Sequence, residues 1–201
     1  MNKVRTISRW LALAMLAVAI WPTAAWAYTK PFNSVSFADA LHGYIAGGDG
    51  SNGVILRTND GGATPWQPTS EPGSYLVGVS SWTSGQATAV SNVGDGIFTT
   101  SDYGVTWNPE APLLSRTISL QSMAYLSGSR RVVVGKLQPS NDLALIASSV
   151  GGATPWTINL QGPYHPEIDP ATELPFTTYA ALSAIDATTS GSVAWAVGND
   201  W

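Results

Sequence analysis

The stretch TTSDYGVTW, residues 99–107, places an acidic side chain where it could do chemistry. Asp102 stands two residues before a glycine and five before a tryptophan, in a chain of which 11% of the residues are charged. In a cleft, such a carboxylate could act as a general acid. In a tight corner, it would instead accept hydrogen bonds from backbone N–H groups a few residues ahead, beside a glycine whose φ other residues avoid. The spacing favours the corner.

Two other segments carry the same motif: TNDGGATPW, which begins at Thr58, and SSVGGATPW, which begins at Ser148. The third copy has Val150 where the other two have the acid, and valine could not replace a catalytic acid. We expect each tryptophan to insert its ring between neighbouring sheets. We therefore interpret the motif as structural, with these residues: Thr58, Asp60, Gly62, Thr64, Trp66, Thr100, Asp102, Gly104, Thr106, Trp107, Ser148, Gly152, Thr154 and Trp156.

The motifs close longer repeats, which span residues 35–66, 79–107 and 122–156, and a fourth copy covers 183–200. Each repeat contains short apolar runs separated by Gly, Asn and Asp clusters, the pattern of strands joined by hairpin turns. Repeats of this length with about four strands each are typical of propeller blades. The sequence therefore predicts an all-β fold: a β-propeller of four-stranded antiparallel blades, about three and a half of them, in an incomplete ring.

The repeats also predict the domain boundaries. Residues 28–34 form an N-terminal segment, and the blades cover 35–78, 79–117, 118–178 and, in part, 179–201. The third blade carries an insertion, residues 157–180, without a counterpart in the other copies. Because propellers usually need four to eight blades, we expect the sequence to be the front part of a longer propeller. A ring closed by two or more chains is the alternative.

Residues 1–27 have the features of a signal peptide: a positively charged start, a short apolar run and a small-residue cleavage site that ends at Ala27. We therefore expect an exported bacterial protein, periplasmic or secreted. The mature chain keeps six of the nine Lys and Arg residues and all 13 acids, so it should repel nucleic acid and anionic lipid surfaces. The chain has no cysteine, which excludes disulfides, thiolate metal sites and a cysteine nucleophile.

The corner motif resembles the Asp-box, or BNR, repeat, S/T-x-D-x-G-x-T-W. From Val35 to Trp66 the order V-S-F-x-D-x-x-x-G-Y-x-x-G-x-x-G is followed by a strand and the corner, and it is most similar to the photosystem II stability and assembly factor family of propellers. The resemblance covers roughly residues 35–200. It implies an exported, non-enzymatic propeller without a cofactor, which binds another protein during assembly or maintenance. It does not imply photosynthesis.

Asp-box glycosidases are the alternative family, and a fragment of a secreted enzyme of this kind stays open. A sialidase is expected to carry an arginine triad, a tyrosine nucleophile backed by a glutamate, and an aspartate acid/base; no motif of this kind surrounds the four arginines of the mature chain. A glucanase needs only two opposed carboxylates. The candidates from inter-strand loops are Asp39, Asp49, Asp95 and Asp186, and each could instead form a turn.

Five further residues are candidates for contact with a partner. Arg130 and Arg131 could contact an acidic peptide or a carboxylate; the alternative is a solvated strand end, and at most one of them lines a given surface because neighbouring strand residues face opposite ways. Four prolines and three acids make the 157–180 insertion an exposed, semi-rigid loop. There, Tyr164, His165 and Glu167 could contact a partner or remain solvated. The turn GGDGSNG offers one carboxylate, too few oxygens for a hard cation.

Overall fold

The computed structural model describes residues 29–50, 52–69, 73–93, 96–111, 113, 118–126, 130–137, 143–150, 156–162, 165–168, 175–178, 181–187 and 194–199. The predicted signal peptide, residues 1–27, lies outside the described residues. The part of the chain that is described consists of strands and turns. None of it forms a helix with the length and apolar character needed to cross a membrane.

Three four-stranded antiparallel sheets follow one another along the chain. The first sheet contains β1 (Phe32–Phe37), β2 (Gly43–Asp49), β3 (Asn52–Thr58) and β4 (Gln67–Pro68). The second contains β5 (Leu76–Thr83), β6 (Gln86–Ser91), β7 (Ile97–Thr100) and β8 (Asn108–Pro109). The third contains β9 (Ile118–Tyr125), β10 (Arg131–Leu137), β11 (Leu143–Ser149) and β12 (Thr157–Gly162). In each sheet the strands lie side by side in chain order.

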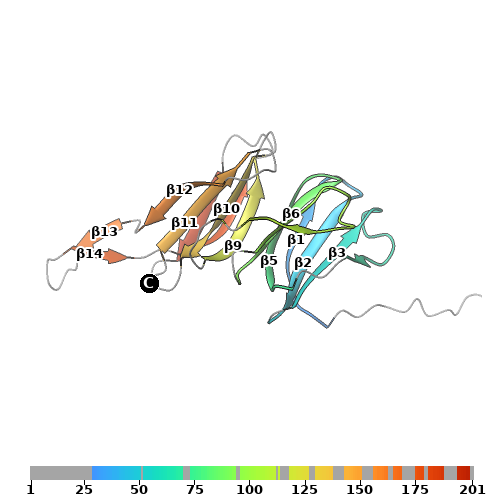
Figure 1. Cartoon of the computed structure of the whole chain (residues 1–201), viewed down its shortest axis with the longest axis horizontal. Coiled ribbons are helices and arrows are strands. Elements are labelled where there is room, and N and C mark those ends of the chain that lie inside the picture. The colour runs from blue at the N-terminus through green and yellow to red at the C-terminus, as the bar shows by residue number, and fades with distance from the viewer. Residues whose placement is uncertain are drawn as a thin grey trace, which may run out of the picture.

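Two shorter ribbons complete the described structure. A fourth, two-stranded sheet pairs β15 (Ala181–Ala187) with β16 (Ala194–Asn199), and a separate hairpin pairs β13 (His165–Ile168) with β14 (Pro175–Thr178). Figure 1 shows the first two sheets at one end of the molecule, the third at the other, and the hairpin extending beyond the third. Three four-stranded sheets and a partial fourth confirm the predicted incomplete propeller.

The core lies between successive sheets rather than within one of them. The first strands of successive sheets are neighbours, β1 beside β5, β5 beside β9, and β9 beside β15. One apolar cluster joins Tyr44 and Ile55 of the first sheet to Leu76 of the second, and another joins Val90 of the second to Leu120 of the third. This face-to-face burial is what holds consecutive blades together.

The insertion differs from the predicted loop. Its first six residues form β12, which pairs with β11 as the fourth strand of the third sheet, in the place that β4 and β8 take in the others. Part of the remainder forms the β13–β14 hairpin. The interpretation of 157–180 as a loop throughout is therefore wrong. The prolines of the insertion suggested a loop. However, an isolated two-stranded ribbon has only edge strands, where proline is tolerated.

Candidate functional site

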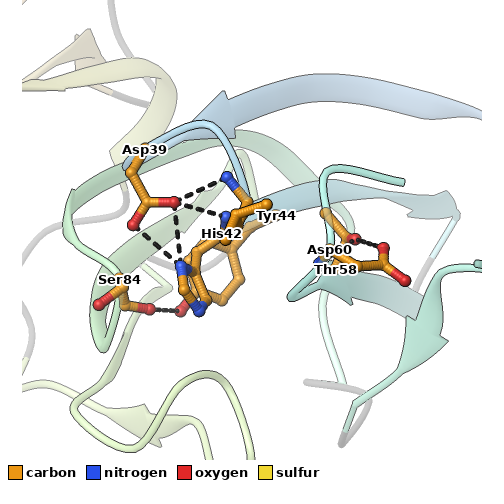
Figure 2. Close-up of polar contacts among 7 residues, drawn as sticks. Asp39, His42, Tyr44, Thr58, Asp60 and Ser84 are labelled. Atoms are coloured by element: carbon orange, nitrogen blue, oxygen red, sulfur yellow. Dashed lines mark hydrogen bonds and ion pairs between the residues drawn. The ribbon is translucent and has the colours of Figure 1, made fainter. Parts of the chain in front are cut away.

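The first corner uses both oxygens of the Asp60 carboxylate. Oδ1 accepts a hydrogen bond from the Thr58 hydroxyl at 2.8 Å (Figure 2). It also accepts from the Gly62 N–H at 3.1 Å, and Oδ2 accepts from the N–H and the hydroxyl of Thr64 at 3.0 and 2.5 Å. The Thr64 hydroxyl is the main cause that lowers the pKa of Asp60. An ionised acceptor with its lone pairs engaged holds a turn and does not donate a proton.

The second corner repeats this geometry around Asp102. The carboxylate accepts from the Thr100 hydroxyl at 2.8 Å and from the N–H and hydroxyl of Thr106 at 2.9 and 2.7 Å. The Thr100 hydroxyl in turn accepts from the Gly104 N–H at 2.9 Å. The bonds to the carboxylate, that from the Thr106 N–H foremost, lower the pKa of Asp102 to about 2. A carboxyl group that stays ionised down to this pH is a poor general acid at neutral pH.

The third corner is described only in part. Ser148 lies in β11, Val150 is exposed, and the side chain of Trp156 is buried. Gly152 and Thr154 lie outside the described residues.

The carboxylates that a glucanase would need are dispersed. Asp39 precedes β2 and Asp49 ends it, so the seven residues of the strand separate them by about 20 Å; paired catalytic carboxylates stand within roughly 5 to 10 Å of each other. Asp49 faces Lys30 at 3.8 Å, and Asp186, in β15 of the fourth sheet, accepts from the N–H of the next residue. Asp95 lies outside the described residues. The described candidates form no catalytic pair.

A small polar cavity opens between the first and second sheets, on the side that carries the corners. Its volume is about 150 Å³. That is roughly the space of five waters and is below the several hundred Å³ typical of sugar and cofactor sites. This volume has room for about one side chain. The lining residues are His42, Tyr44, Arg57, Thr58, Asn59, Gln67, Ser84 and Tyr103.

Tyr44 lines this cavity and does not ionise at neutral pH. Its hydroxyl donates to the Ser84 carbonyl at 2.7 Å (Figure 2). Its ring packs edge-on against Trp107 with centroids 5.9 Å apart. Burial raises the pKa of Tyr44 to about 12. The phenol therefore stays protonated at neutral pH, unlike the nucleophile that a sialidase requires.

Asp39 and His42 form a polar pair at the rim. The Asp39 carboxylate accepts from the N–H groups of Leu41 and His42 at 2.8 and 2.9 Å, which lowers its pKa, the Leu41 bond most of all. The same carboxylate lies 2.9 Å from the His42 Nδ1, as Figure 2 shows. An ionised carboxylate makes this ring nitrogen the donor and so fixes the orientation of the imidazole.

Arg57 supplies the positive charge of the cavity. It lies near the end of β3, and its Nη1 donates to the Tyr103 carbonyl at 2.8 Å. Among the described residues, no carboxylate lies within ion-pair distance of Arg57. The guanidinium has five N–H donors in a planar fork, so it retains donors for an incoming acceptor.

Tyr103 stands at the rim with a strained backbone. Its φ is +62°, in the left-handed region, where Gly61 has +69° at the same position of the first corner. Its ring is exposed and lies 6.0 Å from that of His42, centroid to centroid. A bulky residue in this conformation costs on the order of 1 kcal/mol. Backbone strain of this kind tends to occur at functional sites.

Arg131 does not lie on the surface, so its interpretation as a partner contact or a solvated strand end is wrong. Its side chain is 0% exposed. The guanidinium donates to both oxygens of Glu110 at 2.5 and 3.2 Å, and its Cζ lies 4.9 Å from the centre of the Trp156 ring. The Trp156 Nε1 donates to the same carboxylate at 3.1 Å. The physical reason is that Glu110, from the preceding sheet, compensates the buried charge.

The remaining candidate residues do not share a surface. Arg130 is exposed and precedes β10, at the end of the third sheet that carries the corner. His165 and Glu167 lie in β13, which follows β12 at the opposite end of that sheet. Tyr164 lies outside the described residues. Arg130 and the hairpin therefore cannot contact one small ligand together.

The cavity residues were missed at the sequence level. Two signals could have found them: the Asp39-x-x-His42 spacing in the first turn, and a tyrosine at position 103 where the aligned repeat has glycine. No signal marks Arg57, because the motif that begins at the next residue, Thr58, is accounted for by the corner. Among the described residues, no group of three or more His, Cys, Asp or Glu side chains could hold a metal ion.

The fold defines the class as a β-propeller, and comparison with solved structures agrees. The structure "YCF48 bound to D1 peptide" matches with a TM-score of 0.52 and 21% identity, over 89% of this chain and 50% of that one. YCF48 from Cyanidioschyzon merolae matches with a TM-score of 0.52 and 20% identity, over 83% and 48%. The chain thus spans about half the length of the structures it matches. No protein-family model and no curated protein matches it.

Proposed function

We propose that this chain is an exported, non-catalytic propeller scaffold that binds another protein, in the manner of photosystem II assembly factor-like proteins. The cavity between the first and second sheets receives an acidic side chain of that partner. The observation that carries the proposal is Arg57, which lines the cavity without a carboxylate partner among the described residues. The corner carboxylates already accept hydrogen bonds from their own corners. We therefore assign this side of the molecule to binding.

The solved neighbours support a peptide-binding role. One of them is YCF48 in complex with a D1 peptide, so a propeller of this architecture holds a segment of another protein. We carry over to this chain the binding of a protein segment, but not the D1 peptide as its partner.

The cavity chemistry supports an acidic contact. An arginine fork matches a carboxylate with two parallel hydrogen bonds, which are among the strongest in proteins. The amides of Asn59 and Gln67 add neutral donors around it. On an acidic chain, a lone cation in a recess is where a negatively charged side chain meets least repulsion.

Site-specific photo-cross-linking tests whether a partner occupies the cavity. A photoreactive amino acid replaces Asn59, at the cavity, in the organism that carries the gene. The matched control replaces Asn52, which is also exposed and lies at the opposite end of β3. We expect a discrete adduct from position 59 and none from 52. Equal adducts from both positions, or none from either, would contradict the proposal.

The purified partner then allows a quantitative test. We expect Arg57→Gln to weaken its binding roughly 10- to 150-fold, the range for losing a hydrogen bond to a charged group. Arg130→Gln removes the same charge from an exposed position and should leave binding unchanged. The reverse order would assign the partner to Arg130. Hydrolysis of a fluorogenic sialoside or glucan by the chain, abolished by Asp39→Asn, would instead support the glycosidase alternative.

Export is a separate part of the proposal. It rests on the charged and apolar pattern of residues 1–27. N-terminal sequencing of the protein from the periplasm or medium of a bacterial host should begin at Tyr28. A cytoplasmic protein that still begins at Met1 would contradict export and leave the binding proposal intact.

A further inference from the structure

The imidazole of His42 is held in one tautomer by Asp39. Its Nδ1 lies 3.0 and 2.9 Å from the two oxygens of the Asp39 carboxylate. The same carboxylate accepts from the N–H of Leu41, which lowers its pKa the most and keeps it an ionised acceptor. An ionised carboxylate only accepts, so Nδ1 carries the proton of the neutral ring. The second nitrogen, Nε2, is then an acceptor with a lone pair.

Nε2 is the nitrogen that His42 offers to the cavity. Figure 2 shows it on the side of the ring away from Asp39. The His42 side chain is 28% exposed and lines the cavity together with Arg57. Next to a carboxylate, a lone pair repels and an N–H attracts. The neutral ring therefore disfavours the acidic side chain that Arg57 attracts, whereas the protonated ring adds a second positive donor for it.

The groups around the cavity leave the imidazole as the one that changes charge. Titratable or charged side chains come from each element that meets there: Asp39 of the first turn, Tyr44 of β2, Arg57 of β3, and Asp102 and Tyr103 of the second corner. The pKa of Asp39 and that of Asp102 lie below the ordinary value, so both carboxylates stay ionised above about pH 5. Burial raises the pKa of Tyr44 to about 12. Phenols ordinarily titrate at about pH 10 and guanidinium groups above about 12, whereas imidazole titrates between about pH 5 and 8.

We propose that His42 is a second binding residue of the cavity, and that it binds an acidic side chain only in its protonated form. The inference rests on the proposed function and adds to it a dependence on pH. Arg57 donates to the incoming carboxylate at any pH, and the Nε2–H of the protonated ring donates to it in mild acid. Asp39 positions the ring and balances its added charge. An acidic partner is thus held in mild acid and released as the pH rises.

The direction of this effect follows from linkage between the partner and the proton. A carboxylate beside His42 favours the charged ring, so its binding takes up protons. By reciprocity, protonation of the ring strengthens binding by the same factor. A hydrogen bond to a charged group changes affinity by roughly 10- to 150-fold. We therefore expect binding to be about tenfold tighter, or more, at pH 5.5 than at pH 8.

Titration of the full chain at pH 5.5 and at pH 8, followed by NMR, tests this dependence. The probe is N-acetyl-aspartate amide, whose carboxyl group stays ionised above about pH 5. We expect about tenfold tighter binding at pH 5.5 in the unaltered chain and equal binding at both pH values in His42→Gln. His165→Gln removes the other of the two histidines, in β13, and should keep the dependence.

The outcomes of this titration separate the two proposals. Binding of equal strength at both pH values in the unaltered chain, or a dependence that persists in His42→Gln, would overturn the role of His42 and leave the proposed function intact. Loss of binding at both pH values in Arg57→Gln is expected under either result. An unaltered chain that does not bind the probe at pH 5.5 or at pH 8 would overturn both.

The tautomer can be measured without any ligand. Because the chain has only two histidines, long-range proton–nitrogen NMR spectra resolve both rings. At pH 8 we expect the proton of His42 on Nδ1, and a mixture of tautomers in Asp39→Asn, since an amide can both donate and accept. Asp49→Asn, at the far end of β2, is the control and should leave the tautomer unchanged. A proton on Nε2 at pH 8 would overturn the inference, because the neutral ring would then already donate to a carboxylate.

Discussion

The two contacts between successive four-stranded sheets use the same scaffold in different ways. Between the first and second sheets, the side chains that cross are uncharged or bond to backbone: Tyr44 to the Ser84 carbonyl and Arg57 to the Tyr103 carbonyl. Between the second and third, the buried Arg131–Glu110 pair crosses. The first contact leaves a polar cavity with an available cation, whereas in the second a buried arginine and a glutamate pair with each other.

The difference begins at one position. Thr69 and Glu110 each follow a two-residue fourth strand, and the N–H of each donates to the third strand of its own sheet, at Ile55 and Ile97 respectively. The Thr69 hydroxyl also bonds to the Ile55 carbonyl, within its own sheet. The longer Glu110 side chain reaches the next sheet instead. The charged joint therefore depends on two residues together, Glu110 after the fourth strand of one sheet and Arg131 at the start of β10 in the next.

The largest expected effect is at the second contact. Arg131→Met leaves Glu110 buried without its partner, and we expect a loss of about 3 to 5 kcal/mol in the free energy of unfolding, measured with urea. In the double variant with Glu110→Gln, no charge is buried and the Trp156 N–H keeps an acceptor, so most of the loss should be recovered. A loss below about 1 kcal/mol for Arg131→Met would show that the pair is not a structural joint.

At the first contact, Tyr44→Phe should cost less. It removes one hydrogen bond, to the Ser84 carbonyl, and keeps the ring against Trp107, so we expect a loss of about 1 kcal/mol by the same urea measurement. A loss as large as that of Arg131→Met would erase the distinction between the two contacts.

The second corner should weaken in acid. The pKa of Asp102 is about 2 in the folded chain, below its ordinary value of 3.8. Its stabilising contribution is therefore complete above about pH 5 and is lost as the pH falls through 4 towards 2. Asp102→Asn should flatten the dependence of unfolding on pH in this window. Asp49→Asn, at the far end of β2, is the control. An unchanged pH dependence in Asp102→Asn would contradict the hydrogen-bonded corner.

The smallest expected change in stability is an increase rather than a loss. Tyr103→Gly relieves the left-handed backbone, and we expect a gain of about 1 kcal/mol or less in stability, seen as a higher Tm. The same change removes an aromatic side chain from the cavity rim and should weaken partner binding. A variant that loses stability would show that the Tyr103 ring serves the fold rather than the site.

Repetition made most of the fold predictable. The corners around Asp60 and Asp102 rest on bonds within a few residues, so their geometry is encoded in short motifs that recur along the chain. The burial of Arg131 was not visible in this way, because Glu110 lies 21 residues earlier, in another sheet. The cavity was missed for the same reason: it exists only where β2, β3 and the second corner meet. Local chemistry is predictable from sequence, whereas contacts between sheets require the structure.

The most direct test of the binding recess is an NMR titration with N-acetyl-aspartate amide, which presents a single carboxylate side chain. We expect saturable shifts of the His42, Arg57 and Tyr103 amides, absent in Arg57→Gln and retained in Arg130→Gln. Shifts that do not saturate, that centre on Arg130, or that persist in Arg57→Gln would contradict the assignment of the cavity as the site where this propeller receives its partner.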